Sequence, residues 1–242
     1  MIALTLLAFA AEAPEVALYQ RVLTEHVTED GKVRYAVLHD RIAPLDRFVT
    51  QIAAVTPDSH PALFPSREAK LAYWLNAYNA LVLWAFAKDY PQGQDRLSGK
   101  IGQFNFFFRR KFRVGGVERS LDDIETKSVR KAFGDPRIHF ALVCASESCP
   151  WLSRTAYTAE NLEKELEART RLFVNQPRNV TVDEKTGTLR LSKIFEWYEG
   201  DFGGRVKLLE FLDRYRDEKA ARLAGRSWKI GYFDYSWKLN RD

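Results

Sequence analysis

The sequence predicts a single α+β domain built around one buried helix, with small hairpins and further helices packed about it. The chain has 242 residues, which is enough for one large core and short for two domains. Hydrophobic residues make up 46% of it, a globular composition. Helical and hairpin patterns are interspersed without a regular strand–helix alternation, so a doubly wound parallel sheet is not expected.

The central helix is predicted from the stretch "SREAKLAYWLNAYNALVLWAFAKDY". Ser66 stands at its start as an N-cap residue, and Pro91 lies just past its end. The stretch is apolar on nearly all sides, which is typical of a helix at the centre of a domain. We therefore expect residues 71–89 to form the centre of the core.

The remaining elements follow from periodicity and turn residues. Amphipathic spacing predicts helices over 42–55, 121–133, 159–175 and 196–215, the last broken at Gly203-Gly204. Ser120 and Asp123 form a capping-box pattern at the start of the second of these helices. Hairpins are expected around Gly115-Gly116 and Lys185–Gly187, and a short strand after the turn at Asp30-Gly31. The aromatic tail, 228–240, is expected to be extended and to dock on the core.

The segment "RIHFALVC" reads as a buried strand that carries a histidine. Alternation along it places Ile138, Phe140, Leu142 and Cys144 on one face, and Arg137, His139, Ala141 and Val143 on the other. Ala141 is small and leaves room beside His139. The imidazole is then either a general base or a satisfied core residue.

Both cysteines of the chain, Cys144 and Cys149, flank the turn that follows this segment. The turn is short enough to bring their sulfurs together in a disulfide. If the cysteines are reduced, Cys149 lies on a polar turn before Pro150, where an imidazole can activate a thiolate. A zinc site made from His139 and the two cysteines would lack a fourth ligand. No metal and no cofactor are therefore expected.

Three further side chains are candidates for this site. Glu125 is expected to hydrogen-bond to His139 and set its tautomer, with a surface carboxylate at a helix start as the alternative. Asn76 and Asn79 share one face of the central helix, where an unpaired amide costs about 1–3 kcal/mol. They either tie down a neighbouring loop or orient a catalytic group. We expect His139 and a cysteine to line a common cleft, with Asn76 or Asn79 at its wall.

The net charge of +5 is spread along the chain, and its densest cluster, Arg109-Arg110-Lys111, follows "FNFFF". A basic and aromatic ribbon of this kind can contact nucleic acid or anionic lipid. A strand that enters a hairpin with a solvated basic edge is the favoured interpretation. No nucleic-acid partner is therefore expected.

The N-terminal residues 1–13 predict a signal peptide. Their apolar run ends in Ala11-Glu12-Ala13, a small-x-small cleavage pattern. Cleavage would leave residues 14–242 as the single domain in a periplasmic or secreted protein. The alternative is an N-terminal helix packed on a cytoplasmic domain. No transmembrane segment is expected after the N-terminus, because no run of 18 apolar residues occurs there.

Five motifs together resemble the domain-of-unknown-function 547 family: "YWLNAYNALVL", "SLDDIE", "DPRIHFALVCASESCP", "LSKIFEWYEGDF" and "YSWKLN". They extend from about Gly31 to Asn240 in the family's order and spacing. The resemblance marks these positions: Asn76, Asn79, Glu125, Arg137, His139, Cys144, Cys149 and Pro150. It supports the segment around the cysteines as the site and implies no particular reaction.

The resemblance carries two further points. Bacterial members of the family often have an export signal. In plant members the domain follows a coiled-coil segment, and this sequence shows no such heptad repeat. The tail departs from the family's Tyr-Asp-Trp, because Ser236 and Lys238 flank Trp237. A role for that aspartate would be absent here or taken by Asp234.

Two functions are favoured by these residues over a thiol-redox protein, whose cysteines are usually two residues apart. The first is an exported thiol hydrolase or acyltransferase, in which Cys149 attacks a carbonyl, His139 takes the proton, and Glu125 or an asparagine orients the ring. The second is a non-catalytic binding or scaffold module with a Cys144–Cys149 disulfide. In either case Asn76, Asn79 and Arg137 are the candidate binding residues, and the expected ligand is a small molecule or a peptide.

Overall fold

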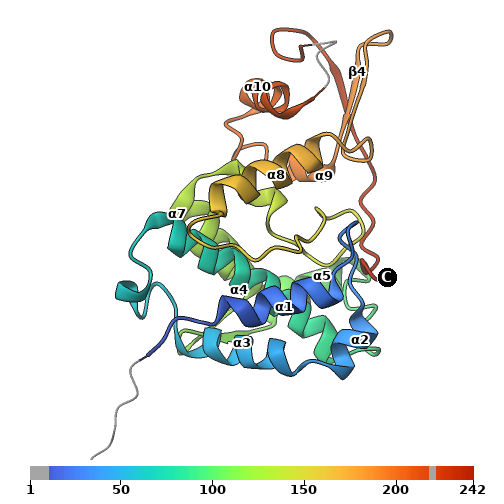
Figure 1. The fold of residues 1–242 in the computed structure, drawn as a ribbon. Coiled ribbons are helices and arrows are strands. Elements are labelled where there is room, and N and C mark those ends of the chain that lie inside the picture. Colours follow the sequence, from blue (N-terminus) through green and yellow to red (C-terminus); the bar gives the residue numbers. More distant parts are fainter. Residues whose placement is uncertain (1–10, 218–221) are drawn as a thin grey trace, which may run out of the picture.

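The computed structural model describes residues 11–217 and 222–242, and its first helices form a layer over the central helix (Figure 1). Most of the predicted signal segment, residues 1–13, lies outside the described residues. The layer contains α1 (Val16–His26), α2 (Tyr35–Asp40) and α3 (Ala43–Ala54). In this layer Tyr19 stacks on Phe48 with their ring centroids 5.2 Å apart.

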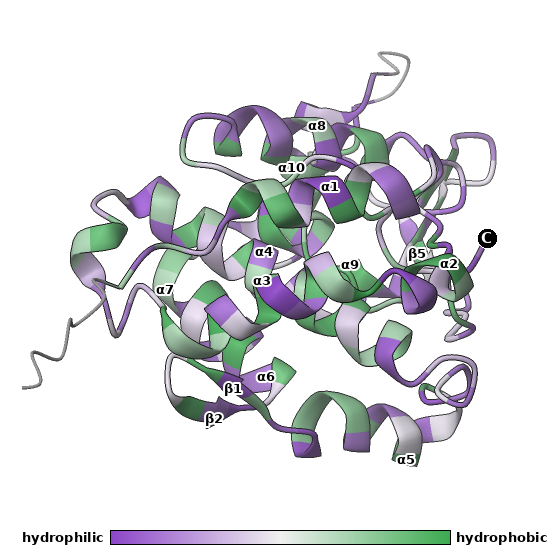
Figure 2. Ribbon diagram, turned by 60° about the horizontal axis from the view of Figure 1, so that its bottom comes forward, coloured by the Kyte–Doolittle hydropathy of each residue, from purple (hydrophilic) through white to green (hydrophobic). Residues whose placement is uncertain are grey.

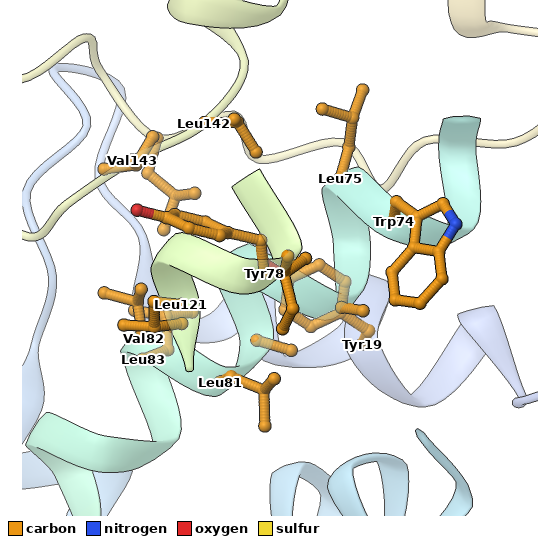
Figure 3. Packing of buried hydrophobic residues seen from close by; sticks show 14 of the residues in the cluster. Tyr19, Trp74, Leu75, Tyr78, Leu81, Val82, Leu83, Leu121, Leu142 and Val143 are labelled. Atoms are coloured by element: carbon orange, nitrogen blue, oxygen red, sulfur yellow. The ribbon is translucent and has the colours of Figure 1, made fainter. Parts of the chain in front are cut away.

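The central helix is α4 (Arg67–Lys88), and its burial confirms the predicted core. The Ser66 hydroxyl accepts a hydrogen bond from the Ala69 amide at 3.0 Å, as an N-cap should. Trp74, Leu75 and Leu81 are 3%, 0% and 0% exposed. Figure 3 shows these side chains packed with residues of neighbouring elements. The chain is a single α+β domain, as predicted.

The middle of the chain lines α4 with short elements, which contact it from Arg67 at its start to Trp84 near its end. A short 3-10 helix, η1 (Pro61–Leu63), precedes α4. The elements that follow α4 are α5 (Gly99–Phe104), η2 (Asn105–Arg109), β1 (Phe112–Val114), β2 (Val117–Arg119), α6 (Leu121–Asp123), η3 (Ile124–Arg130) and α7 (Lys131–Phe133). The predicted hairpin at Gly115-Gly116 is confirmed. Gly115 has φ +60°, and a Cβ there would meet Thr56 at 2.6 Å, so a side chain is excluded. The predicted capping box at Ser120 is also present.

The strand predicted over residues 137–144 is wrong. A 3-10 helix, η4 (Pro136–Phe140), occupies its first half, and irregular backbone follows. The Asp135 carboxylate accepts a hydrogen bond from the Arg137 amide and caps the helix, with Pro136 at its first position. The alternating apolar pattern arises because residues 138–143 are buried on all sides, which periodicity alone does not distinguish from a strand.

Two other expected strands are also helical. After the predicted turn at Gly31, only Val33 makes an isolated β-bridge, and α2 begins at Tyr35. The segment before the first hairpin forms α5 and the π-helical η2 rather than a strand, so Arg109 ends a helix.

The C-terminal part adds a second aromatic core. It consists of α8 (Leu162–Val174), β3 (Val180–Asp183), β4 (Thr188–Leu191), α9 (Lys193–Trp197), α10 (Arg205–Tyr215) and β5 (Lys229–Tyr232). The second predicted hairpin, β3–β4, is extended by β5, which pairs parallel to β4. Phe140 packs between Phe173 and Phe195 at centroid distances of 4.7 and 5.8 Å, and so joins η4 to this core.

Within residues 11–217 and 222–242, no helix combines the length and the apolar character that a bilayer span requires.

The burial of α4 gives a direct test of the core. We expect Leu75→Ala to lower the free energy of unfolding by about 2–5 kcal/mol, because it leaves a cavity in a fully packed region. The control is Val206→Ala, since Val206 is 70% exposed and its change should stay within about 0.5 kcal/mol. Urea denaturation followed by circular dichroism measures both. Equal effects of the two substitutions would contradict this core assignment.

Candidate functional site

A cleft of about 380 Å³ is lined by segments that are distant in the sequence. Its lining comes from α4, η2, η3, the segment that carries His139 and both cysteines, α9 and the C-terminal tail. His139 and a cysteine therefore line a common cleft, which is the arrangement the sequence suggested. Neither Asn76 nor Asn79 lines this cleft, so that part of the expectation was wrong.

Aromatic rings form one wall of the cleft. Trp197, Tyr235 and Trp237 contact one another, with the two indoles stacked at a centroid distance of 5.9 Å. Tyr235 lies 4.8 Å from each of the indoles. Phe107 of η2 lies 6.3 Å from Trp237 and continues the wall. These rings pack on one another, and their contacts hold the wall together.

A carboxylate, Glu125 of η3, faces the cleft with neutral hydrogen-bond donors. The Tyr198 hydroxyl donates to Oε1 at 2.7 Å, and the Tyr78 hydroxyl donates to Oε2 at 3.3 Å. Burial, and then the neighbouring Glu125 carboxylate, raise the pKa of both tyrosines well above the usual range. Both hydroxyls therefore stay protonated and remain donors. Glu125 lies on a π-helical turn, a feature that often occurs at functional sites.

The carboxylate partner of His139 is Asp201 and not Glu125, which corrects the predicted pairing. His139 Nε2 donates to Asp201 Oδ2 at 2.8 Å. The Arg130 guanidinium donates to both oxygens of the same carboxylate at 2.7 and 3.0 Å. The hydrogen bond from His139, together with Arg130, holds the pKa of Asp201 well below its usual range. The imidazole also stacks on the Tyr198 ring at 3.9 Å and is thus fixed in orientation.

Cys144 and Cys149 are joined in a disulfide, with their Cα atoms 6.2 Å apart. The Cys144 amide also donates to the Cys149 sulfur at 2.9 Å, inside the turn. A sulfur in a disulfide carries no proton, so the Tyr235 hydroxyl is the donor in its 3.3 Å contact with Cys144 Sγ. The disulfide thus contacts the aromatic wall directly.

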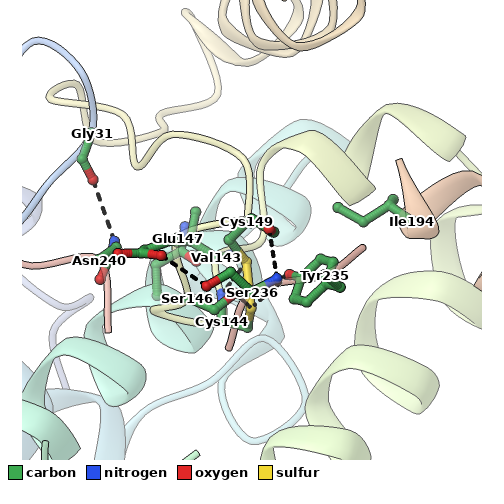
Figure 4. Close-up of a disulfide and its surroundings, with 12 residues drawn as sticks. Gly31, Val143, Cys144, Ser146, Glu147, Cys149, Ile194, Tyr235, Ser236 and Asn240 are labelled. Atoms are coloured by element: carbon green, nitrogen blue, oxygen red, sulfur yellow. Dashed lines mark hydrogen bonds between the residues drawn. A yellow bond between two sulfur atoms is a disulfide. The ribbon is translucent and has the colours of Figure 1, made fainter. Parts of the chain in front are cut away.

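The C-terminal tail lies along the disulfide turn and holds it in place (Figure 4). The Asn240 amide donates to the Ala145 carbonyl at 2.9 Å, and the Glu147 amide donates to the Lys238 carbonyl at 2.8 Å. Ala145 has φ +63°, a conformation that alanine rarely adopts, and its bond to Asn240 helps to hold it. Arg178 adds hydrogen bonds to the carbonyls of Glu147 and Cys149.

The two asparagines of α4 bind backbone rather than the cleft. Asn79 donates to the Ala141 carbonyl at 2.8 Å and accepts from the Val143 amide at 2.9 Å. Asn76 makes the same pair of bonds to the carbonyl and amide of Tyr157, at 2.7 and 2.9 Å. This is the loop-fixing alternative that the sequence left open. Arg137 points elsewhere, because its guanidinium binds Asp135 and Glu163.

Sequence reasoning missed Asp201, Arg130, Tyr198 and Tyr235. Asp201 and Tyr198 lie in "LSKIFEWYEGDF", one of the motifs that carry the family resemblance, so the motif itself was a signal. Tyr235 opens another of these motifs, "YSWKLN", whereas Arg130 lies outside all five, and its role depends on contacts made in the fold. Among the described residues, no group of three histidine, cysteine or acidic side chains is arranged to hold a metal ion.

A scan against protein families matches residues 63–174 to the family described as "Protein of unknown function, DUF547". This range contains α4, Glu125, His139 and both cysteines. It does not contain Trp197, Tyr198 or the tail, which complete the cleft. No curated protein matches the chain, and no solved structure matches it either.

The low pKa of Asp201 predicts how its contribution to stability depends on pH. A carboxyl whose pKa is lower in the folded than in the unfolded chain stabilises the fold above about pH 4 and loses that effect as the pH falls further. We therefore expect Asp201→Asn to destabilise the protein at pH 5 and to differ less from the wild type at pH 3.

Urea denaturation at the two pH values measures the effect. Asp95→Asn is the control, since Asp95 is exposed and makes no ion pair with a described residue. A difference between Asp201→Asn and wild type that is the same at pH 5 and pH 3 would contradict the ion-pair role.

Proposed function

We propose that this chain, which belongs to the DUF547 family through residues 63–174, is an exported domain that binds a small organic ligand in the aromatic cleft. The observation that carries the proposal is the pairing of an aromatic wall with the Glu125 carboxylate in one cleft of about 380 Å³. That volume suits a small molecule, and apolar walls with a few placed polar groups are typical of ligand sites.

The state of the cysteines favours binding over thiol catalysis. A thiol hydrolase needs a free thiolate, and the sulfur of Cys149 is occupied in the disulfide. Among the described residues, His139 makes no hydrogen bond to either sulfur; its bonded partner is Asp201. Export belongs to the same proposal, because disulfides persist in oxidising compartments.

The charges of the cleft favour a ligand with a cationic end. Glu125 and Asp122 are the acidic side chains that line it, and Arg130 is the lining guanidinium. Both direct hydrogen bonds of Arg130 to an acid go to Asp201, so its charge is already matched. Among the described residues, Glu125 and Asp122 are hydrogen-bonded only to neutral hydroxyls, Glu125 to two tyrosines and Asp122 to Thr126, so both carboxylates remain acceptors for a charged donor. The aromatic faces beside it also attract cations.

A pair of ligands of similar size and opposite charge tests this assignment. We expect phenethylamine to bind more tightly than 3-phenylpropionate, because the ring packs on the aromatic wall and the ammonium binds Glu125. Glu125→Gln should weaken amine binding about tenfold or more and should not weaken binding of the acid, because it removes a like charge. Quenching of the fluorescence of Trp197 and Trp237 measures both affinities.

Glu118→Gln is the matched control, since Glu118 is exposed on β2 and lies outside the cleft. The glutamine at position 125 keeps an acceptor for Tyr198, so the variant should fold normally. Equal affinity for the two ligands, or amine binding that Glu125→Gln does not change, would refute a cationic ligand.

The cysteine pair distinguishes the binding function from the thiol enzyme. We expect Cys144→Ser and Cys149→Ser each to lose about 2 kcal/mol of stability, the entropic value for so short a disulfide loop. Both variants should keep amine binding, because the aromatic wall and Glu125 remain. Urea denaturation and the fluorescence titration measure the two effects. Loss of an esterase or amidase activity in reduced Cys149→Ser, with that activity kept in Cys144→Ser, would instead support the thiol enzyme.

A further inference from the structure

Three large apolar side chains project into solvent from α5 and η2. Ile101, Phe104 and Phe108 are 78%, 51% and 48% exposed, and we call them the apolar ridge. Their spacing of three and four residues places them on one side of the helical segment. Phe104 and Phe108 stack on each other at 5.3 Å, so the ridge is continuous. In Figure 2, α5 lies at the rim of the molecule.

The opposite side of the same segment packs on the core. Phe106 is 2% exposed and packs on Phe86 of the core at 4.9 Å. The Arg96 guanidinium lies over both rings, 5.7 and 5.8 Å from their centroids. Because Phe106 anchors the segment to the core, the exposure of the ridge does not come from a loose loop.

The ridge lies in the most one-sidedly charged stretch of the chain. Residues 96–117 contain six basic side chains and no aspartate or glutamate. Arg96 and Arg110 are matched by Asp89, and Lys111 by Asp123. Lys100 and Arg109 flank the ridge, are exposed, and form no ion pair with any described residue. Positive charge beside exposed apolar side chains is the pattern of a segment that lies on an anionic membrane.

The ridge is continuous with the mouth of the cleft. Phe108 lines the cleft as well as the ridge. Trp197, 47% exposed, lines the cleft and also borders a neighbouring groove with Lys100 and Gln103 of α5. An exposed tryptophan beside the ridge suits the headgroup region of a bilayer, where indole rings concentrate.

We propose that the apolar ridge, with Lys100 and Arg109, is a docking surface for anionic lipid bilayers. Ile101, Phe104 and Phe108 enter the boundary between headgroups and acyl chains, and the two basic side chains bind lipid phosphates. The positive charge would also suit a nucleic acid. Ile101 would not, because this most exposed side chain of the ridge offers no ring for base stacking. Docking places the mouth of the cleft at the lipid surface. This inference does not depend on the ligand proposed for the cleft.

Co-sedimentation of the full chain with vesicles tests the proposal. We expect binding to vesicles of phosphatidylcholine with about 30% phosphatidylglycerol and much weaker binding to phosphatidylcholine alone, since each basic residue near an anionic surface contributes about a fivefold affinity gain. Raising the NaCl concentration from 0.1 M to 1 M should release much of the bound protein, because the Debye length falls to about 3 Å. Both Ile101→Ser/Phe104→Ser and Lys100→Glu/Arg109→Glu should weaken binding about tenfold or more.

The controls match these changes at sites away from the ridge. Val206→Ser removes an exposed apolar side chain, and Lys185→Glu/Lys207→Glu makes the same change in net charge; both should bind as the wild type does. Equal binding to the two kinds of vesicle would overturn the proposal. So would charge-dependent binding to duplex DNA that Ile101→Ser/Phe104→Ser leaves intact, or a dimer in solution that the same variant separates.

Discussion

The side-chain amide of Asn79 fixes the backbone on which the whole site depends. It lies in the middle of the buried helix α4 and binds both the carbonyl of Ala141 and the amide of Val143. These groups belong to irregular backbone inside the core, where each unpaired group would cost about 1–3 kcal/mol. The amide satisfies both groups at once, so the segment that carries His139 and Cys144 can cross the core without a strand partner. Asn76 secures the Tyr157 backbone in the same way.

From this segment the cleft is assembled by parts of the chain that are remote in sequence. His139 meets Asp201 across a separation of 62 residues, and Cys144 meets Tyr235 across 91. The disulfide turn and the tail are mutually dependent, because backbone hydrogen bonds join Ala145 to Asn240 and Glu147 to Lys238. The rings of Tyr235 and Trp237 therefore reach the cleft only when the tail is docked. Contacts within the protein thus hold the parts of the cleft together, and such pre-organisation lowers the entropic cost of binding.

Local signals in the sequence predicted much of this fold. The apolar stretch of α4, the Ser66 cap, the capping box at Ser120 and the glycine turns of both hairpins all specify structure through near neighbours. The predicted strand at 137–144 failed because alternation records burial and does not show that Asn79 supplies the hydrogen bonds. The partner of His139 was misassigned to Glu125 for a related reason. A long-range pairing with Asp201 leaves no periodic trace in either segment.

The two carboxylates near His139, Asp201 and Glu125, differ in their hydrogen-bond donors. This difference separates a structural carboxylate from one that is available to a ligand. Asp201 accepts from an imidazole and, through both oxygens, from the guanidinium of Arg130, and the resulting low pKa shows that its charge is well stabilised. Glu125 has only hydroxyl donors, from Tyr78 and Tyr198. No basic side chain of the described residues hydrogen-bonds to these oxygens, and the aromatic faces beside them also favour a positive charge. A cationic group entering past Phe108 would therefore be drawn to Glu125, while Asp201 continues to hold His139 and Arg130 in place.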